Sequence, residues 1–159
     1  MILREATSED EAALASFDLG GDRSPWLDEV AEIVAGLVGW RDDPDHRHLD
    51  RQVVVAEVGG EIVAVAARER VEHERLGPLA DHRYLMVVAV RADYRRSGTA
   101  RMLTESVFVA MQTDGVQTVR WLVHPRNIPS IAFSRSAFPE ADETYPPEDR
   151  PYAAFLLSL

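Results

Sequence analysis

Hydrophobic and polar positions in the first 40 residues predict one strand followed by two helices. Residues 1–6, MILREA, alternate like a short strand. Residues 7–17 predict a helix, because Ser8 and Glu11 have the spacing at which two side chains cap the first free amides of a helix. A second helix is predicted from Trp26 to Trp40, where apolar residues recur at helical spacing and form one stripe: Leu27, Val30, Ile33, Val34 and Leu37.

The middle of the chain predicts a β-hairpin and a further strand. Residues 52–58 and 61–69 are rich in β-branched side chains, and Gly59–Gly60 between them has the composition of a two-residue hairpin turn. Residues 82–90, HRYLMVVAV, are apolar enough to form a strand in the middle of a sheet. The acidic segment RDDPDHRHLD, residues 41–50, predicts a break between the second helix and the hairpin.

The second half of the chain alternates helices and strands. A helix is predicted over residues 100–115, ended by Gly115, because apolar side chains such as Leu103 and Val107 recur on one face. The elements predicted after it are a strand, a short helix and a closing strand, over residues 116–124, 130–138 and 152–159. Whether a further strand lies in residues 138–150 stays open. The closing strand pairs either within its own sheet or across a homodimer.

Length and composition limit the fold and the chemistry. The chain has 159 residues and 46% hydrophobic content, which suffices for one domain, over residues 1–159, with a buried core. The absence of cysteine excludes disulfides, thiolate metal sites and cysteine nucleophiles. No apolar run approaches the roughly 20 residues of a membrane span, and the start does not resemble a secretory signal. We therefore expect a cytoplasmic protein without a membrane partner.

The net charge bears on the partner. With 17 basic and 27 acidic side chains, the formal charge is −10 at pH 7. Such a surface disfavours binding to the phosphate backbone of a nucleic acid or to an anionic membrane. A cationic partner fits better.

Residues 94–103, YRRSGTARML, concentrate positive charge in this acidic chain. They follow a predicted strand and open a predicted helix, so the first helical amides are unpaired. Such a helix start attracts anions, and a glycine lets the backbone approach a ligand closely. The segment therefore predicts a pyrophosphate site around Gly98, assisted by Arg95, Arg96 and Arg101, with a solvated basic helix start as the alternative.

The same segment resembles the signature of the GNAT superfamily of acyl-CoA N-acyltransferases. That signature is a valine-ended strand, a short turn, Arg or Gln, two residues, Gly, one residue, and Gly or Ala at a helix start. Val90, Arg95, Gly98 and Ala100 occupy these positions. Residues 121–138, WLVHPRNIPSIAFSRSAF, are similar to the family's later block, in which an asparagine is followed by a small residue and an aromatic residue in a short helix.

The resemblance implies an α/β (α+β) fold of the GNAT type, with a central mixed, mostly antiparallel sheet flanked by helices. It also implies acetyl-CoA, the acetyl thioester of coenzyme A, as cosubstrate. The resemblance places the phosphates at the start of the helix after the motif and the thioester oxygen at a strand amide. The implied cofactor-binding residues are Val88, Val90, Arg95, Arg96, Ser97, Gly98, Thr99, Ala100, Arg101, Asn127, Ser130 and Phe133. Asn127 is also suited to cap the short helix that follows it.

The general acid departs from the family pattern. Many relatives carry a tyrosine that protonates the departing thiolate, and the matching residue here is Ser134, a weak donor. Tyr145 and Tyr152 are the other protein candidates, and water is a further one.

The general base also lacks its usual residue. Relatives often carry a glutamate or histidine on the strand before the motif. On the face that alternation assigns to Val88 and Val90, this chain offers Met86, Tyr84 and His82.

Four side chains are considered as the base. His124 and Tyr84 rank first, ahead of His82 and Glu69, and histidine titrates nearest neutrality. The structural alternatives are a strand-end His124 that only bonds a loop and a packed strand residue at Tyr84.

Two acidic segments, RDDPDHRHLD and PEADETYPPEDR, either form solvated loops or border the acceptor site and attract a cationic amine. The spacing of acidic residues and histidines in the first matches no established ligand pattern, so we predict no metal site.

The sequence predicts an acetyl-CoA-dependent N-acetyltransferase. The acetyl group is expected to move to a primary amine of a small cationic molecule or a protein, by direct attack in a ternary complex. A catalytically silent acyl-CoA-binding sensor or regulatory module is the alternative, since the usual tyrosine and strand carboxylate are missing. An interaction domain with an incidental motif would not bind coenzyme A at all.

Overall fold

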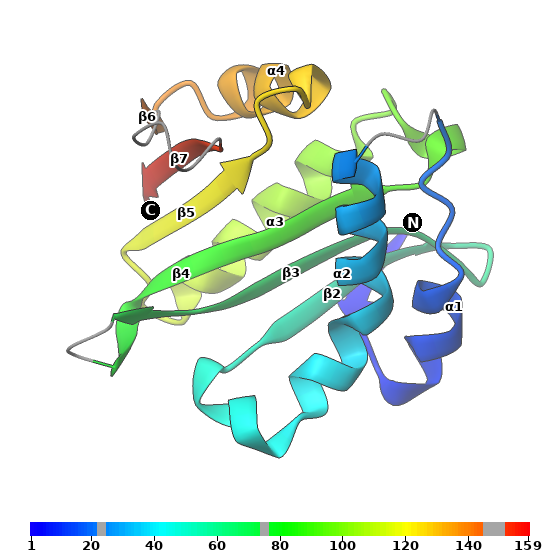
Figure 1. The fold of residues 1–159 in the computed structure, drawn as a ribbon, viewed down its shortest axis with the longest axis horizontal. Helices are drawn as coiled ribbons and strands as arrows, with labels where there is room; N and C mark the ends of the chain where they lie inside the picture. The colour runs from blue at the N-terminus through cyan, green and yellow to red at the C-terminus, as the bar shows by residue number, and fades with distance from the viewer. Residues whose placement is uncertain (22–24, 74–76, 145–151) are drawn as a thin grey trace.

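The computed structural model describes residues 1–21, 25–73, 77–144 and 152–159, and these form one mixed sheet with helices on both faces (Figure 1). The strands lie in the order β1-β2-β3-β4-β5-β7-β6, and every neighbouring pair is antiparallel except β4 and β5. Their bounds are β1 Ile2–Glu5, β2 Gln52–Val58, β3 Glu61–His73, β4 Gly77–Val90, β5 Thr118–Val123, β6 Asp142–Thr144 and β7 Ala153–Ser158.

Four α-helices and three 3-10 helices are described: η1 Ser8–Asp10, α1 Glu11–Ala15, α2 Pro25–Asp42, η2 Pro44–Leu49, η3 Ala92–Tyr94, α3 Thr99–Thr113 and α4 Ile128–Ala137. The predicted α/β class, with a mostly antiparallel sheet between helices, is confirmed. The segment expected to be a break is partly helical, because α2 runs to Asp42 and η2 follows it. Within the described residues, no helix combines the length and the apolar character needed to cross a membrane.

The sheet separates two hydrophobic clusters. On one face, α2 packs Val34 and Leu37 against β2, β3 and β4. On the other face, α3 packs Leu103 and Met111, both fully buried, against the same strands and against β5 and β7. Figure 1 shows the consequence: α2 crosses the near face over β2 to β4, and no helix of the described residues covers the near face of β5 and β7.

The Gly59–Gly60 turn forms as predicted. Both glycines have positive φ, 61° and 87°, and Val58 pairs directly with Glu61 across the turn. Positive φ at both central positions is what a tight hairpin turn requires, and glycine adopts it without strain. The strand β6 answers the question left open for residues 138–150, and β7 pairs with β5 and β6 of its own sheet.

The first cap lies one residue earlier than predicted. The amide of Thr7 donates to Asp10 Oδ2 at 2.7 Å, so Thr7 and Asp10 form the cap, and the predicted pair of Ser8 and Glu11 was wrong. The physical reason is Arg4, whose guanidinium holds Asp10 through two bonds of 2.7 and 2.8 Å. A fixed Asp10 carboxylate is then available to the Thr7 amide.

A bulge in β4 changes which side chains share a face. The register with β3 shifts at Met86, so Met86 joins the cluster under α2, whereas Val88 and Val90 pack on the α3 side. Strict alternation placed Tyr84 and Met86 on the face of Val88 and Val90, and that prediction was wrong. One extra residue in a strand reverses the facing of everything beyond it.

The strands β4 and β5 separate after a short parallel contact. Their pairing runs only from His82 with Thr118 to Tyr84 with Arg120. β4 continues to Val90 and β5 to Val123, and the two diverge toward the start of α3 and of α4 (Figure 1). This V-shaped opening, between residues 85–90 and 121–123, is called the splay below.

Candidate functional site

A segment with unpaired amides opens α3 beside the splay. Gly98 has φ 85° and precedes the first helical residue, and Arg96 also has a positive φ of 61°. The first bond of the helix runs from the Met102 amide to Gly98 O at 3.0 Å. Within the described residues, the backbone amides of residues 96–101 have no hydrogen-bond partner. An anion is the natural partner for such amides at a helix start.

Two short side chains hold this segment in shape. The hydroxyl of Ser97 donates to the carbonyl oxygen of Tyr94 at 2.5 Å and contacts Thr99 Oγ1 at 2.7 Å. Thr99 is buried, while Ser97 and Gly98 are exposed and Ala100 is half-buried. The amides are therefore fixed in position while the backbone stays accessible.

The three arginines of the motif differ in what they contact. Arg95 donates to the carbonyl oxygens of Leu19 and Val90, and Arg101 Nε donates to Glu105 Oε1 at 2.7 Å, which raises the pKa of Arg101. Arg96 is exposed and has no partner among the described side chains. Of the three, Arg96 alone is free for a ligand in the described structure, so the expectation of three available guanidinium groups was too simple.

The end of β4 directs polar backbone groups into the splay. The Arg91 amide donates to Val63 O at 2.9 Å, and this bond shows which residues of β4 direct their backbone groups toward β3. In an antiparallel ladder, alternate residues face the partner strand. Val88 and Val90 therefore turn their amides away from β3 and toward β5, which does not pair with β4 at this level.

The second motif builds the start of α4. Asn127 Oδ1 accepts a bond from the Ser130 amide at 3.2 Å, so Asn127 does cap the helix. Ser130 is half-buried, and the ring of Phe133 meets Phe138 edge to face, with centroids 6.0 Å apart. These contacts explain the motif structurally and leave Asn127 beside the splay.

Ser134 lies in the core, away from solvent. It is 2% exposed, and its hydroxyl accepts a hydrogen bond from Trp121 Nε1 at 3.0 Å. The structure therefore removes Ser134 as a candidate acid, because helical spacing turns it inward toward β5. Tyr145 lies outside the described residues.

The candidate bases are distributed over three strands, β3, β4 and the end of β5. His82 contacts Asp81 at 2.9 Å at the paired end of β4, and Glu69 forms an ion pair with Arg51 at 2.6 Å. Tyr84 stands where the strands part, and burial raises its pKa. These contacts leave Tyr84 and His124 as the candidates nearest the splay.

His124, just after β5, is held on three sides. Its ring stacks on Trp26 with centroids 5.3 Å apart and meets Tyr152 edge to face at 5.7 Å. Its Nδ1 accepts from the Arg126 amide at 3.2 Å. With Nδ1 as acceptor, a neutral ring carries its proton on Nε2, so in this contact His124 offers a donor rather than a base.

Family membership follows from a match that extends over most of the chain, well beyond the motif. The model of the acetyltransferase (GNAT) family matches residues 9–138. The chain belongs to this family. The protein is thus an acetyltransferase of the GNAT type. A search of curated proteins found no match.

Solved structures support the fold of this acetyltransferase. It is similar to a putative GNAT acetyltransferase from Desulfovibrio desulfuricans, with TM-score 0.78, 15% identity, and 99% and 98% of the two chains covered. It is also similar to PaiA N-acetyltransferase from Thermoplasma acidophilum in complex with coenzyme A, with TM-score 0.72, 12% identity, and 99% and 98% covered. A third is the ribosomal-protein-S18-alanine N-acetyltransferase of Escherichia coli, with TM-score 0.66, 21% identity, and 99% and 92% covered.

Sequence reasoning missed the residues of the acetyltransferase that face the splay from α2. Trp26 was recognised only as the start of a helix, and Glu29 was not singled out. Glu29 accepts a bond from the hydroxyl of Tyr152 at 3.2 Å, although 123 residues separate the two. The spacing of Trp26 and Glu29 places them on one helix face, but no local pattern identifies Tyr152 as their partner.

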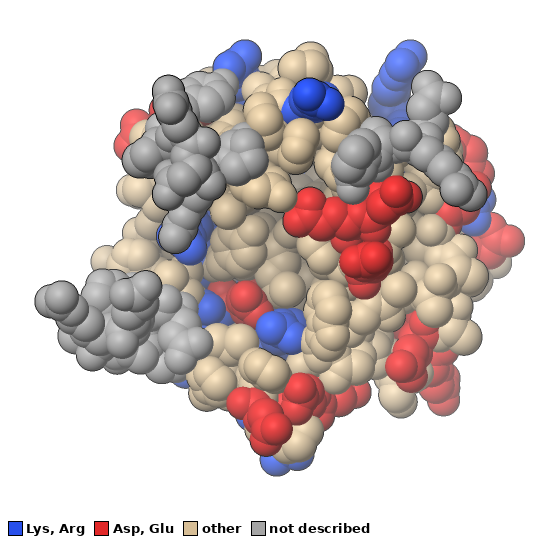
Figure 2. Space-filling view, in the orientation of Figure 1, with Lys and Arg blue, Asp and Glu red and all other residues tan. Residues whose placement is uncertain are grey.

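The near face of the acetyltransferase is hollowed beside these residues. Figure 2 shows a depression in the middle of this face, with Asp and Glu side chains gathered over the upper part of α2 at its edge. The exposed acidic residues of this part of α2 are Asp28, Glu29 and Glu32. In the described part of the chain, no group of three or more metal-ligating side chains could hold a metal ion.

Proposed function

We propose that this acetyltransferase uses acetyl-CoA and transfers the acetyl group to a primary amine of a small cationic molecule or a protein. The observation that carries the proposal is the set of unpaired amides at residues 96–101, at the mouth of the splay. A pyrophosphate there would receive hydrogen bonds from fixed amides and the favourable end of the α3 dipole.

The cofactor is assigned to the residues that line this path. Amides of Ser97, Gly98, Thr99 and Ala100 would hold the pyrophosphate, and Arg96 would add a guanidinium. The pantetheine arm would run into the splay past Asn127 and Ser130. Val88 and Val90 would then bond the arm and the thioester oxygen through backbone groups that no strand of the described sheet uses.

The reaction needs no enzyme nucleophile. A neutral amine attacks the thioester carbon, a backbone amide at Val88 stabilises the oxyanion, and the carbon–sulfur bond breaks to release the thiolate. The nitrogen loses one proton and the sulfur gains one. His124 Nε2–H is our candidate hydrogen-bond donor to the departing sulfur, which takes its proton from water, and the hollow gives the nitrogen's proton a route to water, past the neutral phenol of Tyr84.

A sensor that binds acyl-CoA without turnover is the second candidate, favoured by the burial of Ser134 where relatives carry an acid. Free-thiol release from acetyl-CoA across an amine panel separates the two. We expect thiol release that depends on the amine. Binding of coenzyme A with no thiol from any amine would support the sensor.

A thermal shift with coenzyme A tests the step that both candidates share. A ligand that binds the folded state raises the melting midpoint, so we expect a rise that grows with concentration. No shift at any concentration would overturn both candidates.

A further inference from the structure

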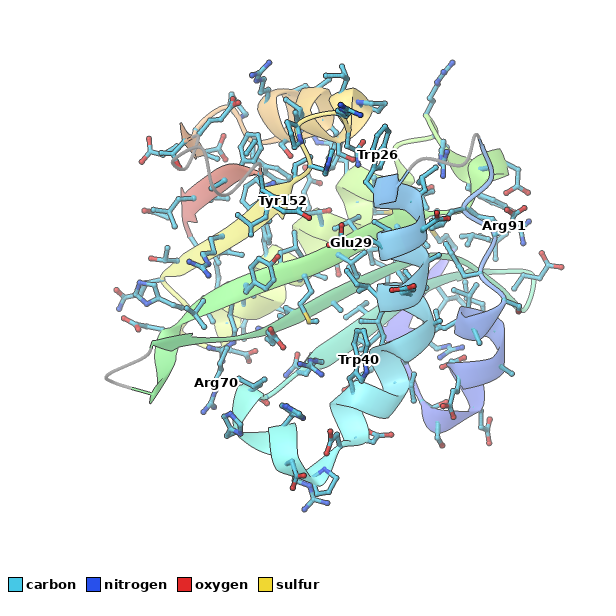
Figure 3. The ribbon with its side chains drawn as sticks, viewed as in Figure 1. Trp26, Glu29, Trp40, Arg70, Arg91 and Tyr152 are labelled. Atoms are coloured by element: carbon cyan, nitrogen blue, oxygen red, sulfur yellow. The ribbon has the colours of Figure 1, made fainter. Side chains whose placement is uncertain are left out.

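Four side chains from three segments form a closed ring above the splay. Trp26 stacks on His124, His124 meets Tyr152 edge to face, and Tyr152 bonds Glu29. Glu29 returns to Trp26 along one turn of α2. Figure 3 shows Trp26 and Glu29 on α2 and Tyr152 across from them, so this ring joins the helix to the β5–β7 half of the sheet.

The ring lies beside the open part of the splay, beyond the last paired residues of β4 and β5. His124 and Tyr152 follow and precede residues that pair across the sheet, Val123 with Ala153. Tyr84, the last residue of β4 paired with β5, lies within electrostatic reach of both Glu29 and Tyr152, and each raises its pKa. An amine that approaches the splay from this face therefore passes the ring.

Glu29 is the carboxylate of the ring, and its partner is weak. The phenol of Tyr152 lies 3.2 and 3.4 Å from its two oxygens, longer than the usual 2.5–3.0 Å of a hydroxyl bond. Asp10 and Glu69, in contrast, each bind an arginine at 2.8 Å or less. Among the described residues no arginine pairs with Glu29, so a cationic ligand can take the place of the phenol.

The neighbours of Glu29 also suit a cation. An ammonium is attracted to the faces of indole and phenol rings, and Tyr152 bonds the carboxylate while Trp26 lies one helical turn before it. The floor of the splay favours a cation less, since the guanidinium of Arg120 already covers the aromatic ring of Tyr84, 5.7 Å from its centroid. A positive group is therefore attracted to the cluster formed by Trp26, His124, Tyr152 and Glu29, and it is repelled from Arg120.

We infer that Glu29 binds a second, non-reacting cationic group of the acceptor; this inference rests on the proposed function. Carboxylic acids are far stronger acids than alkylammonium ions, so a nitrogen held by Glu29 keeps its proton and has no lone pair with which to attack. The attacking nitrogen is a different one, deeper in the splay. The acceptor class is thus a primary amine that carries another cation, such as a diamine.

The test measures binding without turnover. Titration calorimetry compares putrescine, a diamine, with butylamine, the monoamine of equal chain length, on the protein saturated with coenzyme A. We expect the wild type to bind putrescine about three- to tenfold more tightly, the effect of one charge-assisted contact. Glu29→Gln should make the two affinities equal, and the preference in the wild type should weaken with salt.

Asp28→Asn is the matched control, because Asp28 is the neighbouring exposed acid of α2 and its loss changes the net charge equally. It should keep the preference for putrescine. Tyr152→Phe should strengthen putrescine binding, since it frees the carboxylate and retains the ring contact with His124. Equal affinities in the wild type, or a preference that survives Glu29→Gln, would overturn the inference.

This experiment separates the inference from the proposed function. Coenzyme A carries no acetyl group, so the affinities do not depend on catalysis. A putrescine preference that requires Glu29, with no thiol released from acetyl-CoA by either amine, would support the cation site and contradict the transferase reaction.

Discussion

Arg95 donates a hydrogen bond to the carbonyl oxygen of Leu19, which lies 76 residues earlier in the chain. The same guanidinium bonds Val90 O at 3.2 Å. It therefore ties the segment after α1 to the end of β4, next to the amides proposed to hold the cofactor. In this chain Arg95 therefore supports the shape of the segment proposed to hold the phosphates, which is a different role from contacting them.

The roles of Arg95 and Arg96 are separable by substitution. Arg96→Gln should weaken coenzyme A binding about three- to tenfold at low salt and leave the melting midpoint of the free protein unchanged, because Arg96 has no partner among the described residues. Arg95→Gln should lower that midpoint and also weaken binding, since it releases two backbone contacts. Calorimetry and thermal denaturation check both effects.

Salt provides the control for this comparison. The affinity difference between wild type and Arg96→Gln should shrink at about 0.5 M salt, where exposed charges are screened. A lower melting midpoint in Arg96→Gln, or an unchanged melting midpoint in Arg95→Gln, would contradict the assignment.

Gly98 and Gly60 form a matched pair for backbone strain. Their φ values are 85° and 87°, and an added Cβ at either would meet no atom of the described residues within 4 Å. Alanine at either position should cost about 1 kcal/mol of unfolding free energy, because a left-handed conformation disfavours a side chain. Gly98→Ala should also weaken coenzyme A binding about tenfold or more, because its methyl group stands on the backbone that approaches the phosphates.

Urea denaturation and calorimetry measure the two effects separately. Gly60→Ala should lose similar stability with unchanged affinity, since Gly60 belongs to the β2–β3 turn and not to the segment of unpaired amides at residues 96–101. Equal affinity losses in both variants would point to general destabilisation and remove the special role of Gly98.

Ser134→Ala tests whether this serine has any part in the chemistry. The substitution leaves the Trp121 indole without its acceptor in the core, so we expect a loss of about 1–2 kcal/mol in unfolding free energy. The turnover number should not change. Ser136→Ala is the control, because Ser136 is exposed and, among the described residues, bonds only Phe133 O, at 3.1 Å. A large fall in turnover for Ser134→Ala, absent in Ser136→Ala, would restore it as the acid.

Local sequence signals predicted the parts of this structure that depend on neighbours in the chain. Gly59–Gly60 specified its turn through backbone freedom, and Asn127 specified a helix start through its own side chain. The bulge at Met86 has no such signal, because the sequence of a strand that is apolar on both faces is the same kind of run with or without an extra residue. That single residue reversed the expected face of Tyr84.

Contacts between distant segments account for the rest of what the sequence did not predict. Arg95 had a pattern that indicated phosphate binding, yet its partner Leu19 follows only from the fold. Glu29 looked like any exposed helix acid until β7 brought Tyr152 to it. Candidate residues were therefore found in the local motifs and next to β5 and β7, and missed on α2, where only the fold brings Trp26 and Glu29 to the site.

Asp10 makes the stability of the fold depend on pH in the acid range. Two bonds from Arg4, followed by the one from the Thr7 amide, lower the pKa of Asp10 from 3.8 to about 2, and the residue is 7% exposed. A carboxyl whose pKa falls on folding adds stability above its unfolded pKa and loses it as pH falls through the folded value. At neutral pH the contribution is on the order of 2 kcal/mol.

Asp10→Asn should therefore reduce the free energy of unfolding by about 2 kcal/mol at neutral pH. The difference from wild type should stay constant down to roughly pH 4 and vanish by about pH 2, because protonated Asp10 no longer attracts Arg4. Glu9→Gln removes the same charge from the same 3-10 helix, at an exposed position, and should change stability little at any pH. Urea titrations at several pH values measure both variants. A difference that persists at pH 2 would mean that Asp10 acts through packing, since its charge is then largely lost.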